Sequence, residues 1–146
     1  MVVVNTPRSQ ALIGYCGGLG PATENLEAGV NVPCCAITAN SPDGKPIADA
    51  DPLVVTATAR VANSGMELNN RRTSLTVRGK PPMCIEPVTG ELVLKNLRRP
   101  RSVSVQPLDG AGRPLGGSIP AWLSSQGWTF RLDEPATTWF VVAFGQ

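Results

Sequence analysis

The stretch Leu53-Val-Val-Thr-Ala-Thr-Ala-Arg-Val61 decides the fold class, because its side chains alternate in character along the chain. Its odd-numbered residues are all apolar, whereas its even-numbered residues include two threonines and an arginine. An extended chain directs successive side chains to opposite faces, so this alternation predicts a β-strand with one buried face.

Shorter runs with the same period recur along the sequence. We expect further strands at 10–16, 35–39, 74–78, 91–95, 102–107, 127–132 and 138–144. The 146 residues include 15 Gly and 14 Pro, which favour turns between strands and interrupt helices. The glycine-rich segment 17–20 is predicted to be one such turn, since the Gly-Lys-Ser/Thr of a phosphate loop does not follow it.

These runs and turns predict an all-β fold. We expect an antiparallel β-sandwich of Greek-key or jelly-roll type, built from about ten short strands. A single domain that covers residues 1–146 is predicted, because the sequence shows no linker long enough to divide it.

The composition excludes several classes of protein. The chain has no His, which removes the usual general base of Ser-His-Asp and Cys-His catalysis and the commonest zinc ligand. Its net charge of +2 is too small to mark a protein that binds nucleic acid or membranes through charge. The apolar runs 2–4 and 139–144 are too short to span a bilayer, and we recognise no secretory leader.

Three groups of residues have two interpretations each. The first group is the four cysteines, Cys16, Cys34, Cys35 and Cys84, which are either small core side chains or include one disulfide. Cys34 and Cys35 are adjacent and point to opposite faces of a strand, so only one of them could form that disulfide. Asp43, Asp49 and Asp51 form either an ordinary solvated turn or an oxygen-ligand site for calcium, and no other cofactor is predicted. The third group comprises carboxylates that are either solvated or part of a glycosidase-like acid/base pair: Glu67, Glu86, Glu91, Asp109, Asp133 and Glu134.

Several segments together resemble a known family. They are Thr6-Pro-Arg-Ser-Gln-Ala-Leu-Ile-Gly14, Ser41-Pro-Asp-Gly-Lys-Pro-Ile-Ala-Asp49, Thr56-Ala-Thr-Ala-Arg-Val-Ala-Asn-Ser-Gly-Met66, Arg72-Thr-Ser74, Pro82, Glu86-Pro-Val-Thr-Gly90, Val105-Gln-Pro-Leu-Asp-Gly-Ala-Gly-Arg-Pro-Leu-Gly116, Gly127-Trp-Thr-Phe130 and Thr137-Thr-Trp-Phe140. In this order and spacing they look like the non-catalytic C-terminal β domain, similar to a carbohydrate-binding module, that follows the catalytic barrel in bacterial clan A glycoside hydrolases. Two positions depart from that pattern: Leu68 stands where an aromatic residue is expected, and Val141 where a charged one is.

The resemblance implies a module of a secreted, plant-polysaccharide-degrading enzyme whose catalytic carboxylates lie on a (β/α)8 barrel outside this chain. It implies two alternatives. In the first, the module binds a β-linked cell-wall polysaccharide of the β-glucan, xylan or mannan type. In the second, it binds no sugar and packs on the barrel as a purely structural domain.

Sugar binding requires exposed aromatic rings and nearby polar side chains, because pyranose rings stack on aromatics and their hydroxyls need hydrogen-bond partners. We expect Trp122, in a loop, and Trp139, on the outward face of the last strand, to be exposed. Trp128 and Tyr15 are predicted to face the core, as are Phe140, Val142 and Phe144, whereas Thr129 is expected to point outward. The candidate polar contacts are Asn69, Asn70, Arg71 and Arg72.

Overall fold

The fold is all-β, and a computed structural model describes residues 1–16, 20, 22–98 and 100–145. Most of the predicted glycine-rich turn at 17–20 lies outside these residues. In the described residues the chain forms 14 short strands that pair antiparallel, with one 3-10 helix. The elements are β1 (Val2–Asn5), β2 (Ser9–Tyr15), β3 (Leu26–Val30), β4 (Cys34–Asn40), η1 (Ile47–Asp49), β5 (Leu53–Thr58), β6 (Val61–Ser64), β7 (Glu67–Leu68), β8 (Leu75–Val77), β9 (Lys80–Ile85), β10 (Gly90–Leu94), β11 (Ser102–Leu108), β12 (Ile119–Leu123), β13 (Trp128–Arg131) and β14 (Trp139–Gly145). None of the described helical structure is long and apolar enough to cross a membrane.

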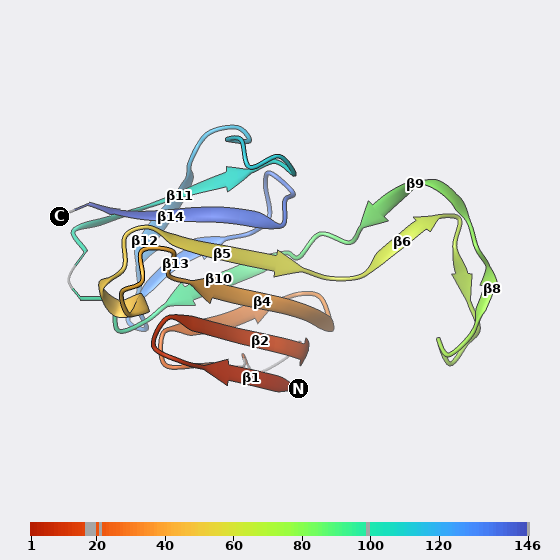
Figure 1. The fold of residues 1–146 in the computed structure, drawn as a ribbon, viewed down its shortest axis with the longest axis horizontal. Helices are drawn as coiled ribbons and strands as arrows, with labels where there is room; N and C mark the ends of the chain where they lie inside the picture. Colours follow the sequence, from red (N-terminus) through yellow and green to blue (C-terminus); the bar gives the residue numbers. More distant parts are fainter. Residues whose placement is uncertain (17–19, 21, 99, 146) are drawn as a thin grey trace.

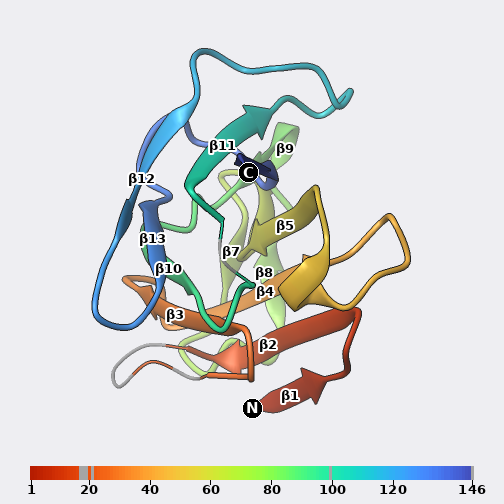
Figure 2. The ribbon, with the colours of Figure 1, turned by 90° about the vertical axis from the view of Figure 1, so that its left-hand side faces the viewer.

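Ten strands form one curled sheet in the order β1-β2-β4-β5-β14-β11-β12-β13-β10-β3. The sheet is a half-barrel (Figures 1 and 2), and not the two-layered sandwich predicted from the sequence. The difference arises at β12, whose first residues pair with β11 and whose last residues pair with β13. One strand therefore joins what would otherwise be two separate layers.

The core fills the inside of the curl. Leu12, Ile37, Val55 and Leu92, from four different strands, are completely buried. At the open side of the curl, the buried Gln10 of β2 donates from Nε2 to Asn25 Oδ1 at 2.9 Å, next to the start of β3. This polar contact holds the two ends of the curl together where no strand pairing does.

The last strand confirms the predicted orientation of its side chains. Phe140 and Val142 are completely buried, whereas Trp139 is 47% exposed. Phe140 meets Phe130 of β13 with ring centroids 6.4 Å apart. Trp128 is half-buried and packs against the core, as predicted.

Two predicted orientations are wrong. Tyr15 is 65% exposed, because it shares the outward face of β2 with Ile13. Thr129 is buried, since its hydroxyl donates to Ser124 Oγ at 3.1 Å instead of meeting solvent. On β2 the apolar Leu12 and Ile13 are adjacent, so alternation did not define the face, whereas 127–132 alternates strictly and Thr129 is buried despite its polar position in that pattern.

The predicted strand at 53–61 is also interrupted. The chain leaves the sheet after Thr58, and β6 begins at Val61, which is 49% exposed and not part of the core. Residues 60–87 project from one end of the sheet as a long hairpin that contains β6 to β9, here called the arm (Figure 1).

Replacing Phe140 with Ala tests which face of β14 holds the fold together. We expect Phe140→Ala to lower the free energy of unfolding by about 3–5 kcal/mol, because it removes a fully buried ring and leaves a cavity. The neighbouring Trp139→Ala is the control and should cost about 1 kcal/mol or less. Chemical denaturation followed by circular dichroism measures both, and equal losses would contradict this assignment of faces.

Candidate functional site

The arm has no core of its own. From residue 60 to residue 87 no residue is buried. Its exposed apolar side chains are Val61, Leu68, Leu75, Val77, Met83 and Ile85. Val61, Leu68 and Ile85 line one hollow, and exposed apolar side chains that gather in this way mark interaction sites in soluble proteins.

The arm bends into a hook where the pairing of its strands is irregular, and a second register shift lies between Glu67 and Leu68 at its tip. The pairing of β6 with β9 shifts register between Asn63 and Ser64. Gly79 lies opposite this shift with a φ of +71°, and a Cβ on it would stand 2.5 Å from the carbonyl oxygen of Ser64. A bulge next to a glycine turns the hairpin sharply, so β7 and β8 form a tip at an angle to β6 and β9.

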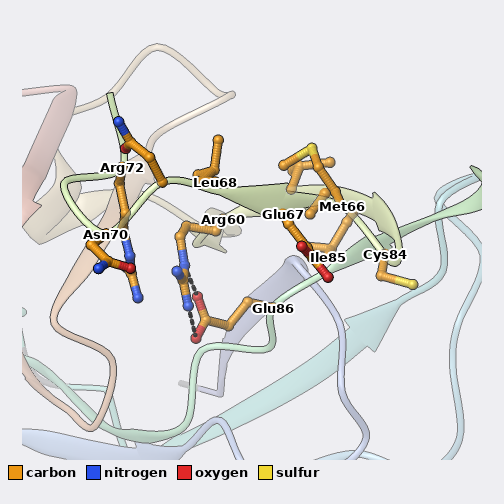
Figure 3. A pocket seen from close by; sticks show the side chains of 12 residues that line it. Arg60, Met66, Glu67, Leu68, Asn70, Arg72, Cys84, Ile85 and Glu86 are labelled. Atoms are coloured by element: carbon orange, nitrogen blue, oxygen red, sulfur yellow. Dashed lines mark hydrogen bonds and ion pairs between the residues drawn. The ribbon is translucent and has the colours of Figure 1, made fainter. Parts of the chain in front are cut away.

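An open hollow of about 960 Å³ lies between the tip and the base of the hook. Apolar side chains of Val61, Met66, Leu68 and Ile85 line it, together with polar residues. Figure 3 shows Asn70 and Arg72, from the tip, on one side of an ion pair at the base. The described lining contains no aromatic residue.

The ion pair joins Arg60 to Glu86 and closes the base of the arm. Arg60 donates from Nε to Glu86 Oε2 at 2.9 Å and from its terminal nitrogen to Oε1 at 3.2 Å, while Glu86 N donates to the Arg60 carbonyl at 2.8 Å. The hydrogen bonds from Arg60 hold the pKa of Glu86 below its ordinary value, and the charge of Arg72 contributes in the same direction. The pair is therefore charged at neutral pH and is lost only as the pH falls through that lowered pKa.

The structure places the four predicted polar contacts at the tip of the arm but gives them different surroundings. Asn69, Asn70 and Arg72 line the hollow, whereas Arg71 does not. The side chain of Asn69 accepts hydrogen bonds from the backbone of Thr73 and Ser74, so it builds the turn of the tip. Asn70 and Arg72 remain the predicted polar residues whose side chains face the hollow.

Trp122 and Trp139 are both exposed, at 41% and 47%, as predicted. Trp122 lies in β12 and not in a loop. β12 pairs with β11 at Pro120, opposite Ser104, and runs on to Trp122 away from Leu108, with which Trp139 pairs. The four positions from Ser104 to Leu108 alone span about 13 Å at about 3.3 Å each, so the two tryptophans do not form one platform.

The three candidate calcium ligands are used within the fold. Asp43 accepts hydrogen bonds from Ser41 Oγ and from the backbone of Lys45 and Asp51, and these bonds lower its pKa to about 2. Asp49 pairs with Arg98 at 3.2 Å, and Asp51 accepts a bond from Phe144 N. The described residues contain no cluster of three or more potential metal ligands, so the three aspartates are not brought together as a site.

The four cysteines are free thiols in two environments. Cys34 and Cys35 point to opposite faces as predicted, because Cys34 is exposed and Cys35 is buried. Cys84 is exposed on the arm, where it lines the hollow, and Cys16 is buried beside Cys35. Burial and the neighbouring Cys16 thiol raise the pKa of Cys35 to about 12.

At the base of the hollow, sequence reasoning missed Arg60 and Ile85 and named Glu86 only as a possible acid/base carboxylate. Arg60, Glu86 and Ile85 lie next to alternating strand patterns that look like those of half-buried strands. No residue type in the segment distinguishes a strand packed on a core from one that projects into solvent. The one signal is the pair Gly79 and Pro81, since glycine and proline within a strand pattern are typical of bulges and edges.

Comparisons of this chain with protein-family models, curated proteins and solved structures find no match. The resemblance to the glycoside hydrolase β domain therefore remains a prediction.

Thiol alkylation tests the surroundings of the cysteines. With iodoacetamide at pH 8, we expect Cys34 and Cys84 to be alkylated in the folded protein, because both are exposed. Cys16 and Cys35 should react only in denaturant, since burial excludes the reagent and Cys35 stays protonated. Peptide mass spectrometry counts the modified residues, and rapid native modification of Cys35 would contradict this arrangement.

Proposed function

We propose that this chain is a non-catalytic accessory β domain that docks through its arm onto another folded domain. The resemblance supplies the candidate for that domain, the catalytic (β/α)8 barrel of a secreted, polysaccharide-degrading glycoside hydrolase. The observation that carries the proposal is that residues 60–87 form a hook that exposes six large apolar side chains and contains no buried residue.

The energetics of the arm support docking. An exposed hairpin buries little apolar surface and so gains little free energy of folding from burial. Isolated two-stranded hairpins are at best marginally stable in water. Contact with a partner would remove the six exposed apolar side chains of the arm from water, at roughly 25 cal/mol for each Å² buried. The arm also has the composition of an interface, because Arg and Met are enriched where proteins meet, and it contains both.

The carboxylates support a non-catalytic function. Glu86 is held by Arg60, and Glu91 and Asp133 both lie within ion-pair distance of Arg131. A general acid needs a carboxyl group with a raised pKa, and the shift at Glu86 is in the opposite direction. The proposal therefore assigns any hydrolysis to the partner domain.

Deleting the arm tests the proposal. Because Glu86 N is bonded to the Arg60 carbonyl, residues 61–85 can be replaced by an Asn-Gly turn that joins the two. We expect the melting temperature of the shortened chain to lie within about 3 °C of the original, since the arm shares no buried core with the sheet.

A clan A barrel stripped of its own β domain then serves as the partner in the same assay. The full chain should raise the melting temperature of the barrel, because a bound partner stabilises the folded state, and the shortened chain should not. Unfolding of the shortened chain would contradict the view of the arm as a separate docking element. Equal stabilisation of the barrel by both chains would contradict docking through it.

Polysaccharide binding is a second candidate, favoured by the exposed ring of Trp139 at the end of the sheet from which the arm projects. Trp139 pairs with Thr56, near the end of β5. Affinity electrophoresis in gels containing β-glucan, xylan or mannan tests it. If the chain is only a docking domain, the polysaccharide should not slow its migration in the gel. Slower migration that is lost in Trp139→Ala and weakened in Trp122→Ala would establish sugar binding. Tyr15→Ala, which removes an exposed aromatic from a different strand, is the control.

A further inference from the structure

We infer that the arm recognises an acidic protein surface with an apolar centre. The inference rests on the proposed docking function and adds the chemistry of the partner. It combines the apolar lining of the hollow with the distribution of charge along the chain.

Positive charge is concentrated on the arm. Residues 60–87 contain five basic and two acidic residues, a net charge of +3, whereas the whole chain has a net charge of only +2. The remaining residues are therefore slightly acidic. This asymmetry is local, and the composition of the whole chain conceals it.

Most of the arm's cations have no ion-pair partner in the part of the chain that the structure describes. Arg60 is paired with Glu86, but Arg71, Arg72, Arg78 and Lys80 form no ion pair with any described residue. Outside the arm, Lys45, Lys95, Arg98 and Arg131 are each paired with a carboxylate, whereas Arg8, Arg101 and Arg113 form no ion pair with a described residue. Of the arm's unpaired cations, Arg72 lines the hollow next to its apolar side chains, an arrangement complementary to a carboxylate beside an apolar surface.

The distribution of charge and residue types distinguishes among possible partners. A second arm would bring two surfaces of charge +3 together, so repulsion opposes pairing between copies of the arm. Single-stranded nucleic acids and sugars are recognised largely through aromatic stacking, and the described lining of the hollow holds aliphatic side chains and Met66 but no aromatic. Aliphatic side chains and methionine instead match the side chains of another protein.

A library of displayed random 16-residue peptides, selected on the immobilised full chain, tests this inference without a known partner. We expect the enriched peptides to combine Asp or Glu with large apolar residues. Their affinity should fall as salt is raised, because exposed charge pairs are screened.

Two matched variants localise the binding. Arg71→Gln/Arg72→Gln/Arg78→Gln should weaken the selected peptides about tenfold, the effect of losing three exposed ion pairs. Arg8→Gln/Arg101→Gln/Arg113→Gln removes the same charge from exposed positions on the sheet and its loops and should change the affinity less than about twofold. Leu68→Ser/Ile85→Ser, which makes the hollow polar without touching the core, should also weaken binding.

Three results would overturn the inference. The first is enrichment of neutral or basic peptides, or of none. The second is equal weakening by the two arginine triples. The third is arm-dependent binding of duplex DNA or polygalacturonate as tight as that of the peptides, which would mean that the arm recognises negative charge alone. None of these results bears on the deletion experiment, which decides separately whether the arm docks.

Discussion

The contact between Phe130 and Phe140 lies inside the curl of the sheet, and the arrangement of the strands depends on it. The two rings come from β13 and β14, which β11 and β12 separate in the strand order, yet their centroids are 6.4 Å apart. Strands so far apart in a flat sheet could not bring their side chains together. Burial of this inner face, at several kcal/mol for each large ring, therefore requires the sheet to curl, and β12 allows it by pairing with a different neighbour at each of its ends.

The arm is held by a different kind of interaction. Its shape comes from local backbone features: the register shift at Asn63, the positive φ of Gly79, the turn built by Asn69 and the ion pair that closes its base. None of these buries apolar surface. The arm therefore keeps its shape without a core, and its apolar side chains stay available to a partner. The sheet contributes stability, and the arm is the element through which we propose that the chain makes contact.

Alternation predicted the faces of some strands and failed on others, even where it was strict, as at Thr129 and Val61. The pattern of β14 assigned Phe140 inward and Trp139 outward, and both assignments are confirmed. On β2 the apolar Leu12 and Ile13 are adjacent, so the pattern left the face undefined and Tyr15 was assigned to the wrong one. The candidate site was predicted in part: Asn70 and Arg72 face a hollow, but the distance between Trp122 and Trp139 depends on strand register, which the sequence does not specify.

The all-β class, the positions of most strands and the two faces of β14 could be predicted from the amino-acid sequence, because a period of two follows from the geometry of an extended chain. Tertiary structure alone decided that the strands form one curled sheet and that residues 60–87 leave it. The physical reason is that a strand packed on a core and a strand exposed to solvent can have the same alternating pattern of apolar and polar residues. Which of the two a segment becomes depends on what lies opposite it, and none of the described strands of the curled sheet packs against the arm closely enough to bury a residue of it.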